Sequence, residues 1–173
     1  SLPGMAASLA ALLRALAVEP RWVVGHSAGA AVLVRACLDG ALAPRAVLSL
    51  NGALLPLGGL RHPGFASFAR LFVSGSLLPR LFAWRAADPA LTGRILAETG
   101  SRIDARGVEL YRRLASRPAH VAAALTMMSM WDPRPLARDL PRLAPPLVLY
   151  TGSRDGMIPP TEADKVRALL PSA

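Results

Sequence analysis

The sequence predicts an α/β fold, in which a parallel β-sheet is flanked by helices. Three short apolar runs, residues 21–25, 45–50 and 146–151, have the length and composition of buried strands. Stretches with helical periodicity precede, separate and follow them, and this alternation is typical of parallel strands joined by crossover helices. The 173 residues are 53% hydrophobic, which is enough for one domain with a sizeable core. We expect helices on both faces of the sheet.

The first elements along the chain are a helix, a strand and a second helix. Residues 5–18 are predicted to form an amphipathic helix, because the leucines from Leu9 to Leu16 recur at three- and four-residue spacing. Residues 21–25 then predict a strand buried on both faces. Residues 28–39 predict the following helix, which Gly40 is placed to stop.

The next strands lie far apart in the sequence. Residues 45–50 predict a second strand and residues 146–151 a third. Residues 161–170 predict a closing helix, with Thr161 as its N-cap and Asp164 as the capping-box partner.

The segment between the second and third strands interrupts the alternation. Residues 53–130 contain no clear strand, and they hold ten arginines against four acidic residues. We therefore predict a helical cap at 53–130, inserted into a core made of 1–52 and 131–173. Its helices are expected near 65–73, 89–98, 104–115 and 118–130.

Charge and cysteine content restrict the function classes. The net charge of +9 comes almost wholly from arginine, since Lys165 is the only lysine. Either the base composition of the genome or an anionic partner explains this positive charge. The arginines are scattered and no nucleic-acid module is present, so we expect no nucleic-acid partner. Cys37 is the single cysteine and reads as a small core residue. A reducing, cytoplasmic location is expected, with peripheral membrane contact as an alternative, and no stretch is long enough to span a membrane.

The pentapeptide Gly25-His26-Ser27-Ala28-Gly29 joins the first strand to the second helix. This G-x-S-x-G spacing is typical of a nucleophile elbow, a sharp turn that exposes a serine hydroxyl. We expect a side chain at either glycine to collide with the neighbouring strand or helix. The Ala28 N–H is placed to donate to a developing oxyanion. The alternative is an ordinary glycine-rich turn with an idle serine.

A serine nucleophile needs a base, and the base needs an orienting carboxylate. Asp155 follows the strand at 146–151 and is the candidate catalytic acid; alternatively, it only forms a turn beside Gly156. The other place for such an acid, at the end of the preceding strand, is held by Asn51, which cannot serve as a carboxylate.

No histidine follows Asp155, although the chain order on such folds is serine, acid, histidine. The three histidines, His26, His62 and His120, all precede it. We expect an incomplete domain that lacks both ends, with the base supplied from outside these residues. The alternative is a degenerate, non-catalytic protein.

With these motifs placed, the chain resembles the α/β-hydrolase superfamily. More narrowly, it is similar to the α/β-hydrolase-like magnesium-chelatase accessory proteins of bacteriochlorophyll biosynthesis. The resemblance implies Ser27 as nucleophile, Ala28 in the oxyanion hole and Asp155 as triad acid. The narrower one implies a role near magnesium insertion into protoporphyrin. The segments that carry it are residues 24–31, 49–56, 79–85, 99–102 and 127–132.

Two functions stay open from the sequence. The first is hydrolysis of an ester or similar acyl bond; the second is non-catalytic binding of a tetrapyrrole or docking on the chelatase. Asn51, Met127, Met128 and Trp131 are candidates to line an apolar substrate pocket for a flat ring or an acyl chain, with ordinary core packing as the alternative for the last three. No metal-ligand cluster or nucleotide loop is present, so no metal or cofactor is expected.

Overall fold

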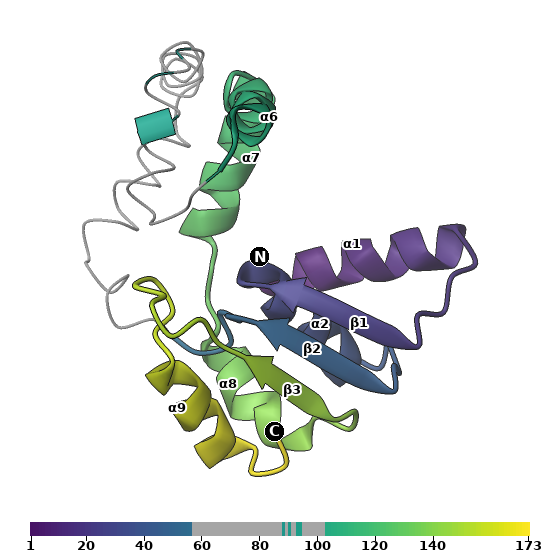
Figure 1. Ribbon diagram of the computed structural model, residues 1–173. Coiled ribbons are helices and arrows are strands. Elements are labelled where there is room, and N and C mark those ends of the chain that lie inside the picture. The colour runs from purple at the N-terminus through teal and green to yellow at the C-terminus, as the bar shows by residue number, and fades with distance from the viewer. Residues whose placement is uncertain (57–87, 89, 91–92, 95–102) are drawn as a thin grey trace. The chain divides into compact units, whose positions relative to one another are not determined.

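The computed structural model describes residues 1–56, 88, 90, 93–94 and 103–173 (Figure 1). The chain divides into two compact units, the first made of Ser1–Leu60 with Trp131–Ala173 and the second of Arg61–Met130. The sequence analysis placed the boundaries of the cap at 52/53 and 130/131, and this cap assignment stays a prediction. The helix expected at 65–73 and His62 lie outside the described residues, as does most of the helix expected at 89–98.

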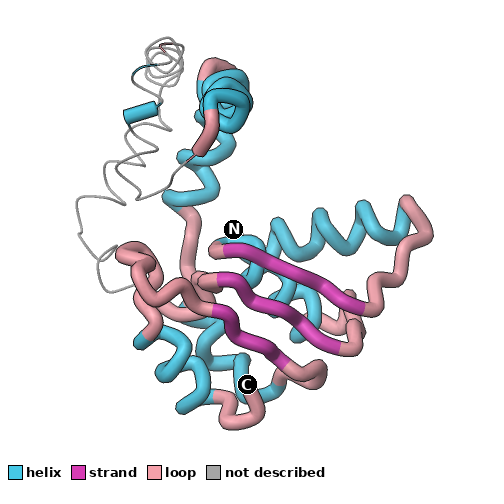
Figure 2. The backbone as a smooth tube through the Cα atoms, in the orientation of Figure 1, coloured by secondary structure: helices cyan, strands magenta, loops and turns pink. Residues whose placement is uncertain are grey.

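The first unit contains a three-stranded parallel sheet. Its strands are β1 (Trp22–His26), β2 (Ala46–Leu50) and β3 (Leu147–Tyr150), in the order β1-β2-β3 (Figure 2). All three strands were predicted to within one residue at each end. Because the strands are parallel and adjacent, the residues that follow them gather at one edge of the sheet.

The helices of the first unit pack against one face of this sheet (Figure 1). Parallel crossovers are right-handed, and both crossovers advance the sheet in the same direction, so the helices between the strands fall on the same side. Their side chains join inward-facing strand residues such as Val23, Val47 and Leu147 in a single core. The helices are α1 (Leu2–Ala15), α2 (Ala28–Leu38), α8 (Arg134–Asp139), the short 3₁₀ helix η2 (Leu140–Arg142) and α9 (Thr161–Leu169).

The opposite face of the sheet is exposed. The alternate strand residues Trp22, Val24, Leu50, Val148 and Tyr150 are 36% to 61% exposed. The expectation that helices cover both faces, and that the first strand is buried on both, is therefore wrong for the described residues. The apolar composition of β1 predicted burial, but the pattern along the strand alternates, with only Val23 and Gly25 buried.

Two helices differ at their ends from the prediction. Helix α1 begins three residues early because the Ser1 hydroxyl accepts a hydrogen bond from the Gly4 N–H at 3.4 Å. It ends before Ala17, which has a φ of 51°. The N-cap of α9 is Pro160, without a side-chain cap bond, so Thr161 is its first helical residue and the predicted capping box is wrong.

Helix α2 ends as the sequence predicted. Gly40 has a φ of 71°, a left-handed conformation that glycine adopts without strain. Cys37 is buried on this helix, as expected, and burial raises the pKa of its thiol to about 11.

Helix α8, which the sequence analysis did not predict, is tied to α2 by a buried ion pair. Arg35 of α2 donates to Asp139 at 2.9 Å and to Asp39 at 2.6 Å. Arg138 and Arg142 also contact Asp139. The hydrogen bond from Arg35 is the largest cause that holds the pKa of Asp139 below its usual range.

The second unit contributes helices α6 (Ala105–Ala115) and α7 (Pro118–Ser129), close to the predicted 104–115 and 118–130. Asp104 caps α6 by accepting from the Gly107 N–H at 2.7 Å. Arg112 and Arg113 pair with Glu109 on the same helix, and the pKa of Glu109 falls to about 2. Among the described helices of the whole chain, none combines the length and apolar character that crossing a bilayer requires.

Candidate active site

The β1–α2 turn places Ser27 in a strained conformation. Its φ of 52° and ψ of −120° lie outside the regions that serine ordinarily adopts. Ser27 occupies the N-cap position of α2, where a serine hydroxyl normally accepts a helix N–H, yet its side chain makes no cap bond. In this strained conformation the hydroxyl does not cap the helix, which is the usual structural role of a serine at this position.

The two glycines of the motif are under different constraints. A Cβ on Gly25 would lie 2.6 Å from the Cα and N atoms of Ala30, so this position requires glycine. A Cβ on Gly29 would meet nothing within 4 Å. The expectation of a collision is thus confirmed at Gly25 and wrong at Gly29, since Gly29 already lies on the exposed side of the first turn of α2.

The first turn of α2 supplies a hydrogen-bond donor next to Ser27. Ala28 is the first residue of this helix, so its N–H has no acceptor within the helix. The positive end of the helix dipole adds to the attraction for negative charge at this point. The geometry is that of an anion-stabilising helix end beside a serine hydroxyl.

Asp155 lies in the loop that follows β3. Its Oδ1 accepts hydrogen bonds from the N–H groups of Met157, at 2.8 Å, and Ile158, at 2.9 Å. The carboxylate therefore shapes its own turn, as the alternative from the sequence held. Among the described residues its Oδ2 has no hydrogen-bond partner, so one oxygen is left for a further donor.

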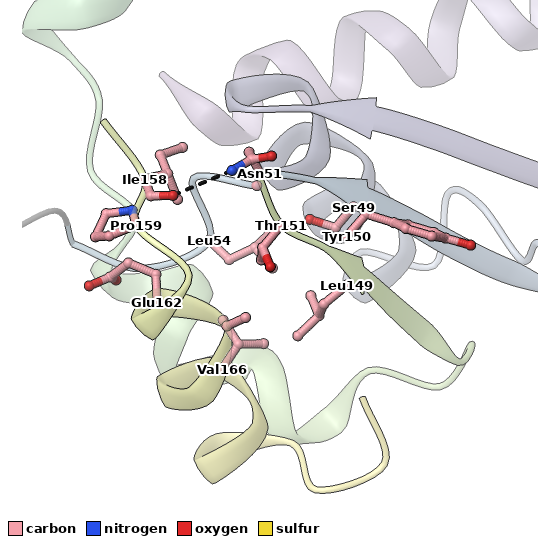
Figure 3. Close-up of a pocket in the computed structure, with 12 residues that line it drawn as sticks. Ser49, Asn51, Leu54, Leu149, Tyr150, Thr151, Ile158, Pro159, Glu162 and Val166 are labelled. Atoms are coloured by element: carbon pink, nitrogen blue, oxygen red, sulfur yellow. Dashed lines mark hydrogen bonds between the residues drawn. The ribbon is translucent and has the colours of Figure 1, made fainter. Parts of the chain in front are cut away.

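Asn51, at the end of β2, contacts the same loop. Its Oδ1 accepts from the Gly152 N–H at 3.1 Å. Its Nδ2 donates to the Ile158 carbonyl at 3.4 Å (Figure 3). The backbone φ of Asn51 is 44°. Sequence reasoning named Asn51 only as a non-acid and a pocket residue, and it missed this link, because the partners are about a hundred residues away in the chain.

A small pocket lies between the ends of β2 and β3 and helix α9 (Figure 3). Its lining includes Asn51, Ile158 and Val166, together with two buried polar side chains, Ser49 and Glu162. The Ser49 Oγ and one Glu162 oxygen have no hydrogen-bond partner among the described residues. Of the four residues predicted to line a substrate pocket, Asn51 alone contributes to this one.

The other predicted pocket residues are divided between the two units. Trp131 is half-buried against the core of the first unit. Met127 is half-buried and Met128 exposed on α7 of the second unit. The substrate pocket shared by these residues stays a prediction.

Within the described part of the first unit, no hydrogen bond links the His26 side chain to Ser27 or Asp155. His26 is the exposed last residue of β1, and His120 is exposed on α7 in the second unit. Across the described stretches, no three His, Cys, Asp or Glu side chains gather as a potential metal site.

Comparison with known proteins decides the family. The sequence matches the alpha/beta hydrolase family over residues 1–172. This chain belongs to the alpha/beta hydrolase family. The predicted fold class and superfamily are thereby confirmed.

Solved structures agree with this membership at the level of the fold. An alpha/beta hydrolase fold protein from Burkholderia ambifaria superposes with a TM-score of 0.70 at 20% identity, covering 94% of this chain and 59% of the other. A putative lipase from Acinetobacter baumannii gives a TM-score of 0.65 at 14% identity, covering 98% of this chain and 56% of the other.

A curated relative narrows the comparison. The chain is 36% identical over 172 residues to the magnesium-chelatase 30 kDa subunit of Rhodobacter capsulatus. The match covers 99% of this chain and 60% of that protein. The chain therefore spans about three fifths of the relative's length.

Proposed function

We propose that the complete protein containing this chain is a serine hydrolase that cleaves an ester or similar acyl bond. The observation that carries the proposal is the strained backbone of Ser27, with a hydroxyl that makes no cap bond at the N-terminus of α2. A serine with no catalytic role at an N-cap stabilises its helix by accepting a capping hydrogen bond, whereas a nucleophilic hydroxyl has to remain available for reaction. Membership of the alpha/beta hydrolase family supports the same conclusion.

The proposed chemistry divides the roles among three residues of this chain. The Ser27 Oγ attacks the acyl carbon and forms a tetrahedral intermediate, whose oxyanion accepts from the Ala28 N–H. The hydroxyl proton passes to a histidine outside residues 1–173. The free Oδ2 of Asp155 orients that histidine and stabilises its protonated form. The bond to the leaving group then breaks, the histidine returns its proton to that group, and the acyl group remains on the Ser27 Oγ as an ester. A water molecule gives a proton to the same histidine and attacks this ester, which releases the acid and restores the serine hydroxyl.

A fluorophosphonate probe tests this proposal directly, since it reacts far faster with an activated serine than with an ordinary hydroxyl. The complete protein is treated with the probe, and the adduct is located by peptide mass spectrometry. We expect labelling at Ser27, loss of labelling in Ser27→Ala, and much slower labelling in Asp155→Asn, which keeps the Oδ1 contacts of the loop. A folded protein that stays unlabelled at Ser27 contradicts the proposal.

A second function is supported by one specific observation, the 36% identity to a protein named as a magnesium-chelatase subunit. On this proposal the fold holds a tetrapyrrole or contacts a chelatase, and the serine is inherited but idle. The exposed side chains on α6 and α7, which include Arg113 and Met128, offer cationic and apolar groups to a porphyrin carboxylate and ring. Quenching of porphyrin fluorescence by the complete protein, unchanged in Ser27→Ala, is the result that favours this function.

We also propose where in the cell the protein acts. The buried Cys37 thiol, the single cysteine of the chain, fits a reducing compartment such as the cytoplasm. The net charge of +9 makes peripheral contact with anionic lipid the alternative. Co-sedimentation with vesicles of anionic lipid at low salt, lost at high salt, is the result that favours peripheral lipid contact. Absence of co-sedimentation at either salt concentration favours the cytoplasm.

A further inference from the structure

The carboxamide of Asn51 connects the two halves of the candidate site. Asn51 directly follows the central strand β2, with Ser27 after the strand on one side and the Asp155 loop after the strand on the other. Its Oδ1 accepts from the Gly152 N–H, and its Nδ2 donates to the Ile158 carbonyl. These two partners are the ends of the segment that carries Asp155.

The loop transmits this anchoring to the carboxylate. The Asp155 N–H donates to the Gly152 carbonyl at 3.1 Å, and the Asp155 Oδ1 accepts from the N–H groups of Met157 and Ile158. Asp155 is therefore bonded to both ends of the segment that Asn51 holds, through its backbone N–H at Gly152 and through its carboxylate at Ile158. A shift at either end moves the Oδ2 that faces a histidine in the proposed mechanism.

On its other side the segment after β2 is bonded to the serine turn. The Ala53 N–H donates to the Ser27 carbonyl at 3.0 Å. Gly52, between Asn51 and Ala53, is closely packed, since a Cβ there would collide with the Ser49 Oγ and lie 2.9 Å from the Ala30 Cβ. Residues 51–53 thus form a short, closely packed link from Ser27 to the acid loop.

We propose that Asn51 is a positioning residue, which sets the Asp155 carboxylate relative to Ser27; this rests on the hydrolase function proposed above. The residue type follows from the two bonds. The Gly152 N–H requires an acceptor and the Ile158 carbonyl requires a donor, and a carboxamide carries both. Asparagine also tolerates the φ of 44° found here better than most side chains do.

A double-mutant cycle on the complete protein tests the proposal. Asn51→Gly removes both bonds at a backbone conformation that glycine adopts without strain, so folding is preserved. Asp155→Asn removes the charge and keeps the loop contacts. The readout is the rate of fluorophosphonate labelling at Ser27. We expect Asn51→Gly to slow labelling by about tenfold to a hundredfold, as a displacement near 1 Å does. In the Asp155→Asn background it should cause no further loss, because Asn51 acts through Asp155.

The fold of Asn51→Gly is checked by its circular-dichroism spectrum, which we expect to match that of the wild type. A wild-type labelling rate in Asn51→Gly, or a full further loss in the double variant, overturns the role of Asn51. A wild type that does not label at Ser27 overturns the hydrolase proposal itself, and the positioning role with it, so the two failures are distinguishable.

Discussion

The two glycines around Ser27 give a quantitative test of the site geometry. A Cβ at position 25 would lie 2.6 Å from two atoms of Ala30 and 2.8 Å from the carbonyl carbon of Gly29. All three are backbone atoms of the first turn of α2, so no side chain can rotate away. Ordinary contact begins at 3.4 Å, so Gly25→Ala requires the start of α2 to retreat by about 0.8 Å.

The magnitude follows from that displacement. Overpacking a tight site costs about 1 to 3 kcal/mol, and we expect the upper end because backbone has to move. Ser27 and the Ala28 N–H move with the helix, and a misplacement near 1 Å costs about a hundredfold in rate. Gly29→Ala is the matched control, because its Cβ meets nothing within 4 Å. It gains about 0.5 to 1 kcal/mol of helix propensity instead.

The assay is urea unfolding of the complete protein and both variants, combined with the rate of fluorophosphonate labelling. We expect Gly25→Ala to be less stable and much slower to label. Gly29→Ala should be as stable as the wild type or more so, and should label at the wild-type rate. Equal loss in the two variants, or a greater loss in Gly29→Ala, would refute the assignment of the steric constraint to Gly25.

Three further predictions concern the core. Arg35→Met should lower the melting temperature by several degrees, because it removes the buried partner of Asp139, whereas Arg134→Met, at a pair whose arginine is 78% exposed, should change it little. The pKa of Asp139 is lowered on folding, so its stabilising effect is present above the ordinary carboxyl pKa and is lost as the pH falls through the lowered value. As the pH decreases, the melting temperature should therefore fall less steeply in Arg35→Met than in the wild type. An equal slope in the two proteins contradicts this. Burial and a pKa of about 11 should keep Cys37 unreactive toward iodoacetamide at pH 8 until urea unfolds the protein, so rapid modification of the native state contradicts its placement in the core.

Local patterns in the sequence were sufficient for most elements of the described fold, with α8 and η2 as exceptions. The apolar runs predicted all three strands, and the leucine spacing predicted α1, because burial selects side chains at the period of each element. Gly40 predicted the end of α2, since a left-handed residue is needed there. The G-x-S-x-G motif likewise identified Ser27, because a strained turn restricts the residue types that can form it.

Contacts between distant segments were decided by the tertiary structure alone. The sequence gives no periodic signal for the ion pair between Arg35 and Asp139 or for the bonds from Asn51 to the acid loop, since the partners are about a hundred residues apart. The exposed face of the sheet could not be predicted from the sequence either, because an apolar strand has the same composition whether one of its faces or both are covered. Composition and spacing record what a residue needs locally, and only the packed chain determines which distant group meets that need.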